Sequence, residues 1–296
     1  MAARTFRHAW SPVAAIYGGT VHFEERPIPV PAALRPWISD VSVATLGALA
    51  GEQTVAEAPD HATALVLRVT PGEYSDLVVT GPRTRALYHA GKPGPFCVRA
   101  RIQPGRARLL LGQSVKGLLN RAVSLSDLWG EPGEHLSRML AEAGSDPATI
   151  AQRLPLQRIE QALLGRVLVQ ETGDRSRSDL AYRAALLLAG DDGAAATGPE
   201  PVAATAARLN VSERHLRNLF TEAAGISPKH FARLARLGTV VAHAGNMRWA
   251  QLAAEAGYYD QSHMNAEFRR LMGVPPGAYT ASRVPAASPC SLHRPG

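Results

Sequence analysis

The chain has 296 residues, of which 46% are hydrophobic, and it carries a formal net charge of +7 at neutral pH. This length allows two domains, and the hydrophobic content is sufficient for each to have its own core. No apolar run approaches the roughly 18 residues that a membrane-spanning helix requires. Residues 1–10 also lack the apolar segment of a signal peptide, so we expect a cytoplasmic protein with no membrane partner.

The cysteines and histidines do not form metal-binding patterns. Cys97 and Cys290 are far apart, and neither lies in a CxxC or CxxH arrangement, which argues against a disulfide framework and against a zinc site. In the first half of the chain, His22, His61 and His89 stand alone rather than as a His-x-His pair. The sequence therefore predicts neither a metal nor a cofactor.

The first part of the chain is β-prone. Residues 1–33 are rich in proline, glycine and isolated charges, which favours an extended arm. Short β-prone runs separated by turn signals follow, up to residue 113. The expected strands are 41–46, 64–69, 77–79, 86–89, 97–102 and 107–111. Short strands at this spacing indicate an antiparallel barrel or sandwich.

Helical periodicity begins near Val115 and continues over residues 133–143 and 148–169. The last of these segments carries an apolar stripe formed by Ile159, Leu163, Leu164, Val167 and Leu168. Two interpretations of the stripe stay open. It either packs on the chain's own β-rich domain or forms a seam between two copies in a homodimer.

The rest of the chain reads as helical. Residues 173–177 are polar and predict a linker, and Ser178 is a candidate N-cap for a helix over 179–189. A loop rich in Gly, Ala and Pro is expected at 190–201. Residues 284–296 contain proline and serine without periodicity, so we expect a disordered tail.

Two helix-turn-helix patterns occur in tandem, at about 202–223 and 249–272, with a long helix expected over 228–244. In such a unit a first helix braces a second helix, which lies in the major groove of DNA. Both patterns have alanines where the helices cross. Each also has a turn residue that tolerates a positive φ, Asn210 in the first and Gly257 in the second.

The second helices of the two patterns also begin and end alike. Ser212 and Asp260 are candidate N-caps, and glycine, an apolar residue and proline close the units at 225–228 and 273–276. Residues 201–283 hold 10 Lys+Arg against 5 Asp+Glu, so positive charge coincides with the patterns. A basic surface attracts nucleic acid, because phosphate contacts release counterions.

The outward faces of these second helices carry the candidate DNA contacts. On the first, Arg214, Arg217 and Asn218 suit the guanine and adenine edges in the major groove. On the second, the polar residues are Gln261, Ser262, His263 and Asn265. Arg269 and Arg270 follow one turn later, where contact with phosphates is expected.

At these residues the chain resembles the AraC/XylS family of bacterial transcription regulators. The match covers about 178–283 and is most specific at 256–268, which begins Ala-Gly-Tyr-Tyr-Asp-Gln-Ser-His. The resemblance implies seven helices in which two helix-turn-helix units are joined by a long helix. It places the family's base-reading positions at Arg214, Arg217, Asn218, Gln261, Ser262 and Ala266. Arginine is usual where this chain has Ala266, so we expect the first unit to specify more of the DNA sequence.

The N-terminal half is similar to the cupin-like sensor domain of one subgroup of that family, at 59–61, 81–85, 99–105 and 110–112. Together the patterns predict an α+β protein. An antiparallel β-barrel or cupin-like domain with flanking helices is expected over 1–172. An all-α DNA-binding domain of two helix-turn-helix units joined by a long helix is expected over 178–283.

We therefore expect a sequence-specific transcriptional regulator, an activator or a repressor, that binds double-stranded promoter DNA. RNA polymerase, a small-molecule effector and a second copy of the chain are further partners that the sequence leaves open. One alternative is an enzyme on the β-domain, for which Cys97 near Arg99 and Arg101 is the candidate thiol. Another is an interaction module whose helix-turn-helix units no longer read DNA. No nucleophile–base pair, phosphate loop or paired carboxylate is found, so we predict no catalytic residue.

Overall fold

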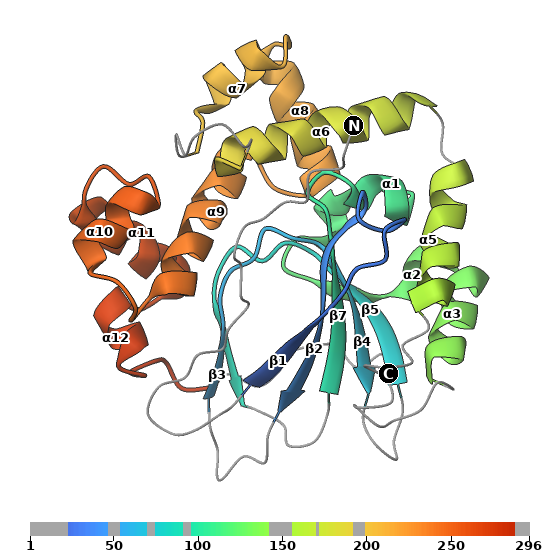
Figure 1. Cartoon of the computed structure of the whole chain (residues 1–296), viewed down its shortest axis with the longest axis horizontal. Helices are drawn as coiled ribbons and strands as arrows, with labels where there is room; N and C mark the ends of the chain where they lie inside the picture. The colour runs from blue at the N-terminus through green and yellow to red at the C-terminus, as the bar shows by residue number, and fades with distance from the viewer. Residues whose placement is uncertain are drawn as a thin grey trace.

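The chain folds into a β-rich part followed by a helical part, which confirms the expected α+β class (Figure 1). The computed structural model describes residues 23–46, 54–69, 75–90, 96–141, 156–169, 172–191 and 199–287. The described strands all precede residue 125, and from Thr172 onward the described regular elements are all helices.

The main sheet is antiparallel and has six strands in the order β1-β2-β7-β4-β5-β8. In chain order, its strands are β1 (Phe23–Ile28), β2 (Ile38–Leu46), β4 (Ala64–Val69), β5 (Ser75–Thr80), β7 (Phe96–Ile102) and β8 (Ala122–Ser124). The remaining two, β3 (Thr54–Glu57) and β6 (Leu87–Ala90), pair only with each other. We refer to this two-stranded sheet as the ribbon.

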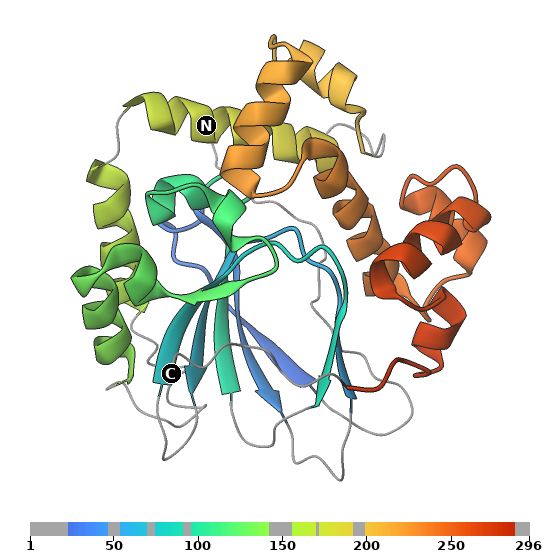
Figure 2. The ribbon, with the colours of Figure 1, turned by 180° about the vertical axis from the view of Figure 1, so that it is seen from behind.

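One face of the six-stranded sheet is apolar and is covered by helices. Leu65, Val79 and Val98 are buried on this face. The helices α3 (Glu131–Ala141) and α5 (Leu156–Val169) lie beside β4 and β5 (Figure 2). Ile159 and Leu163 of α5 belong to the same core. At these two positions the apolar stripe of α5 therefore packs on the chain's own β-rich part, which is the first of its two interpretations.

Two expectations about secondary structure are wrong in the region that follows β7. The expected strand at 107–111 is the helix α1 (Ala107–Leu111), because Leu109, Leu110 and Leu111 are all buried and a strand would turn alternate side chains outward. The helical stripe expected from Val115 ends early, since the 3-10 helix η1 (Val115–Leu118) gives way to β8. A further short helix, α2 (Leu125–Trp129), follows β8.

The arm expected over residues 1–33 is wrong where the structure describes it, because β1 pairs with β2 along its whole length. Pro27 lies in this strand. Proline lacks the amide hydrogen that a central strand must donate, so it is tolerated here because β1 is at the edge of the sheet. The ribbon strand β3 was also not expected from the sequence.

The linker expected at 173–177 is also wrong, because α6 (Thr172–Ala189) runs through it without a break. Ser178 is not an N-cap. It is buried inside α6, where its hydroxyl donates a hydrogen bond to the carbonyl of Gly105 at 3.2 Å. Arg106 binds both Ser178 and Asp179. Asp174, one of the polar residues that suggested a break, binds Arg108 of α1, so this segment also attaches α6 to the β-rich part.

The helical part agrees with the expected tandem arrangement. After α6 come α7 (Val202–Arg208), α8 (Glu213–Ala224), α9 (Pro228–His243), α10 (Trp249–Glu255), α11 (Gln261–Met272) and α12 (Pro276–Thr280). Phe220, Phe231 and Phe268 are fully buried at the centre of this part. The tail expected to be disordered lies outside the described residues from position 288 onward, and so does Cys290.

A charged network joins the ribbon to the six-stranded sheet. Glu57 of β3 pairs with Arg83 and accepts a hydrogen bond from His89 of β6 at 3.1 Å. Asp60, just beyond β3, pairs with Arg101 of β7 at 2.5 Å. Burial alone would raise the pKa of the Glu57 carboxyl. The charge of Arg83 and the hydrogen bond from His89 outweigh burial and hold that pKa well below its usual range.

This network makes the free energy of unfolding depend on pH. A carboxyl whose pKa is lowered by folding contributes stability above its unfolded pKa, near 4.5 for Glu57, and loses it as the pH falls further. We expect Glu57→Gln to cost about 1.5–3 kcal/mol at pH 7, the usual loss for a hydrogen bond to a charged group. Denaturant unfolding between pH 7 and pH 3 should show a shallower acid loss in Glu57→Gln than in the wild type. Parallel pH profiles would contradict this account.

Candidate nucleic-acid interface

The first helix-turn-helix unit consists of α7 and α8. Asn210 in the turn has a φ of 56°, the left-handed conformation that asparagine tolerates better than most residues. Ser212 caps α8 by accepting a hydrogen bond from the amide of His215 at 3.2 Å. Leu216 and Phe220 are fully buried beneath the helix. The turn and the N-cap thus fix the orientation of α8 relative to α7, as the sequence predicts.

The second unit, α10 and α11, repeats this geometry. Gly257 occupies the turn with a φ of 73°. Asp260 caps α11 by accepting from the amide of His263 at 2.7 Å. Met264 and Phe268 are the buried anchors of the helix. Each unit therefore presents the amino-terminal half of its second helix outward, and a side-chain N-cap satisfies one of the free amides at that end.

The candidate DNA contacts lie on the open sides of these two helices. All but one are exposed, namely Arg214, Arg217 and Asn218 on α8, and Gln261, Ser262, His263, Arg269 and Arg270 on α11. Asn265 is half-buried. Ala266, where the family pattern has arginine, is exposed as well, so this position offers only a methyl group to a ligand.

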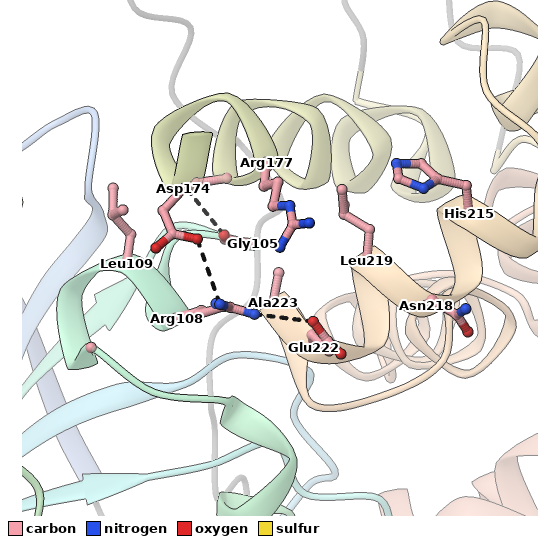
Figure 3. A pocket seen from close by; sticks show the side chains of 12 residues that line it. Gly105, Arg108, Leu109, Asp174, Arg177, His215, Asn218, Leu219, Glu222 and Ala223 are labelled. Atoms are coloured by element: carbon pink, nitrogen blue, oxygen red, sulfur yellow. Dashed lines mark hydrogen bonds and ion pairs between the residues drawn. The ribbon is translucent and has the colours of Figure 1, made fainter. Parts of the chain in front are cut away.

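Two of the candidate side chains on α8 face neighbours within the protein. Arg217 forms an ion pair with Glu213, one turn earlier on the same helix. Asn218 lies at the edge of a cavity of about 230 Å³ between α1, α6 and α8 (Figure 3). The structure therefore brings α8 into contact with the β-rich part beside its outward face.

Arg108 of α1 is the centre of that contact. It donates to Glu222 of α8 at 3.0 Å and to Asp174 of α6 at 3.5 Å, and Figure 3 shows it between the two carboxylates. Arg177 of α6 points toward the same cavity. The ion pair between Glu222 of the helical part and Arg108 of the β-rich part thus fixes the position of the first unit.

Sequence reasoning missed a buried carboxylate on α11. Glu267 is 8% exposed and accepts a hydrogen bond from Arg233 of α9 at 2.7 Å. The other carboxylate oxygen of Glu267 accepts from a guanidinium nitrogen of Arg236 at 3.5 Å and from the hydroxyl of Tyr258 at 3.1 Å. Glu267 lies three residues after the buried Met264, which is a core-facing spacing. That periodicity was the available signal for an inward-facing acid.

This cluster joins the long helix α9 to the second unit. Burial raises the pKa of the Tyr258 hydroxyl above its usual range, and the negative charge of Glu267 raises it further. The guanidinium of Arg236 lies over the Tyr258 ring, with its central carbon 5.1 Å from the ring centroid. Tyr258 therefore stays protonated and donates to Glu267, and the direction of α11 relative to α9 is set by paired charges as well as by apolar packing.

The described residues contain no group of three or more His, Cys, Asp or Glu side chains arranged to hold a metal ion. Cys97, the candidate thiol, is a half-buried residue of β7. Within the same described part of the chain, no helix combines the length and the apolar character needed to cross a membrane.

Comparison with known families identifies the helical part. Residues 205–282 match the family model described as a helix-turn-helix domain, and this segment is of the AraC type that the sequence patterns resemble. The match includes α8 to α12 and most of α7. The helical part thus carries a helix-turn-helix domain of the AraC type, which supports a role in DNA binding and transcriptional regulation.

Solved structures of two proteins are similar to this chain. The C-terminal domain of AraT, a response regulator from Geobacillus stearothermophilus, is 20% identical, with a TM-score of 0.31 over 37% of this chain and 87% of that one. ToxT from Vibrio cholerae O395 is 11% identical, with a TM-score of 0.41 over 82% and 96%. Unsaturated fatty acid bound ToxT from V. cholerae strain SCE256 is 14% identical, with a TM-score of 0.39 over 81% and 94%. No curated protein matches the chain.

The Glu267 cluster leads to a prediction about stability. In Glu267→Gln, Arg233 and Arg236 lose the negative charge that neutralises them in a buried setting, so we expect a loss of about 3–5 kcal/mol in the free energy of unfolding. Urea titration of the full chain measures this loss. The control is Glu255→Gln, whose exposed carboxylate accepts a hydrogen bond from Gln251 and whose loss should change stability by less than about 0.5 kcal/mol. Equal effects of the two substitutions would show that the buried pairs do not stabilise the protein.

Proposed function

We propose that this protein regulates transcription by binding promoter DNA sequence-specifically, with α8 and α11 in two successive segments of the major groove. The observation that carries the proposal is the repeated geometry of the two units. Each has a positive-φ turn, a side-chain N-cap and an exposed polar amino-terminal half on its second helix. Two rigid units joined by α9 suit two groove segments on one side of a duplex.

We assign different roles to the two helices. Arg214, Arg217 and Asn218 offer guanidinium and amide groups that pair with guanine and adenine edges. On α11 the corresponding polar set is Gln261, Ser262, His263 and Asn265. Ala266 cannot hydrogen-bond a base, so α8 contributes the larger share of sequence choice. Arg269 and Arg270 contact phosphates and fix the register of α11 on the duplex.

We further propose that the β-rich part modulates DNA binding, as a cupin-like sensor that ends near residue 172 and precedes the DNA-binding domain from residue 178. The contacts of Arg108 with Asp174 and Glu222 support this proposal, because they connect the β-rich part to both α6 and α8. A small-molecule effector would act through such contacts. We assign no catalytic role to either part, because an AraC-type domain accounts for the site without one.

Sequence-specific binding can be tested with DNA from upstream of the protein's own coding region and with a scrambled control. We expect the affinity of the full chain to fall steeply as salt rises from 50 to 200 mM, by about 10³-fold if about six phosphates are contacted. Electrophoretic mobility shifts or fluorescence anisotropy measure this slope. Binding that is absent, or that does not change with salt, would favour an interaction module that no longer reads DNA.

Two substitutions distinguish the recognition of bases from contact with phosphates. Arg217→Ala should cost about 1–3 kcal/mol on the preferred site and relax the preference at one base position. Arg270→Ala should weaken binding to all sequences alike and reduce the salt slope by about one. Arg138→Ala, an exposed arginine on α3, is the matched control and should change neither quantity. Identical effects of Arg217→Ala and Arg270→Ala would refute the assigned roles.

A further inference from the structure

The ribbon formed by β3 and β6 contacts both the helical part and the six-stranded sheet. In Figures 1 and 2 it lies on the side of the β-rich part nearest α11 and α12. Ala56 and Tyr88 are directly opposite each other in the ribbon, and both are buried in the same apolar core as α9 and α11. One face of the ribbon is therefore part of the core of the helical part.

The other face of the ribbon is turned toward the six-stranded sheet. Successive residues of a strand point to opposite faces, so Glu57 and His89 lie on the side away from Ala56 and Tyr88. Glu57 and His89 bind each other, and the charge of Arg99 on β7 helps to lower the pKa of the Glu57 carboxyl. The ribbon thus has a charged face in the β-rich part and an apolar face on the second unit.

The strand β6 and the residue before it provide hydrogen-bond donors to the carboxyl end of α11, the second of the two helices proposed to read DNA, which we call the recognition helices. The last carbonyl groups of a helix have no partner within it. In α11, the Leu271 carbonyl accepts a hydrogen bond from the Ala86 amide at 3.0 Å. The Met272 carbonyl accepts one from the Tyr88 hydroxyl at 2.6 Å, in a buried setting. Burial raises the pKa of Tyr88 to about 12, so this donor keeps its proton throughout the neutral range.

The first recognition helix is held at the same end by a different segment of the β-rich part. Glu222, in the last turn of α8, binds Arg108. Gly225, which ends α8, packs so closely on η1 that an added Cβ would lie 3.0 Å from the Val115 carbonyl oxygen. Both recognition helices are therefore anchored by their carboxyl ends to the β-rich part, while the proposed DNA contacts are at the opposite ends or on the outer faces.

We propose that Tyr88 is a positioning residue for DNA recognition, and that the ribbon sets the direction of α11 relative to α8. The inference rests on the proposed function, because it concerns how two DNA-reading helices are spaced. The helix α9 joins the units through the Glu267 cluster, and the ribbon adds a second, independent attachment. A second copy of the protein or a ligand that moved the ribbon would change the distance between the bases that the two helices reach.

The spacing between the two half-sites in DNA is therefore the quantity to measure. A sequence that the full-length wild-type chain binds is first selected from a randomised duplex library. One base pair is then inserted or deleted between the segments read by α8 and α11. A rigidly held α11 cannot follow this change, so the wild type should bind the altered spacing much more weakly than the selected one.

In Tyr88→Phe the ring stays in the core and only the hydrogen bond to Met272 is lost. We expect the ratio of affinities between the selected and the altered spacing to shrink by about threefold or more, which is the range of one such bond. The control is Tyr182→Phe, which removes a hydroxyl from a half-buried ring that packs under Arg106 in the α6 contact and should leave the ratio unchanged.

A purely structural role for Tyr88 would lower affinity equally at every spacing, and that result would overturn the proposal. An unchanged ratio in Tyr88→Phe, or an equal change in Tyr182→Phe, would overturn it as well. If the wild type selects no sequence from the library, the proposed function fails, and this inference fails with it. Selection of a sequence followed by an unchanged ratio overturns only the role of Tyr88.

Discussion

A buried carboxylate is stable only if nearby positive charges neutralise it. Glu267 of α11 is neutralised by Arg233 and Arg236 of α9, and these two ion pairs hold α9 against α11. The arrangement of the helical part depends on them. Apolar contacts between α9 and α11 tolerate small rotations, whereas two ion pairs and the hydroxyl of Tyr258 have directional requirements. The long helix is therefore a rigid connection between the two units, and the direction of one unit constrains the other.

The features that follow from local sequence were predictable. Asn210 and Gly257 stand in positive-φ turns, and Ser212 and Asp260 cap the helices that follow. In each case the signal and the structure it predicts lie within four residues. The exposed positions of the candidate DNA contacts follow from the same periodicity, because the buried anchors fix which side of each helix faces out.

The features that depend on distant contacts were not predictable. Residues 107–111 form a helix because three consecutive leucines are buried by elements far away in the sequence. The polar residues at 173–177 suggested a linker because polarity is common to linkers and to contacts between parts of a protein. Only the contact of Asp174 with Arg108, next to the contacts of Ser178 and Asp179 with Arg106, distinguishes the two. The ribbon is a similar case, since one of its faces packs in the core of the helical part and its other face carries the paired Glu57 and His89.

The ion pair between Arg217 and Glu213 has a consequence for the order of events at DNA. In the free protein the charge of Arg217 is paired with that of Glu213, so this pair adds no net charge to the long-range attraction between the helical part and the duplex. In the proposed complex Arg217 exchanges this carboxylate for a base edge, and Glu213 loses its partner. In that complex a guanine in the correct place compensates the lost ion pair by accepting two hydrogen bonds from the guanidinium, and the other bases do not. Under the proposed function the ion pair therefore acts after the first encounter with DNA, and it raises discrimination by penalising sites that lack this guanine.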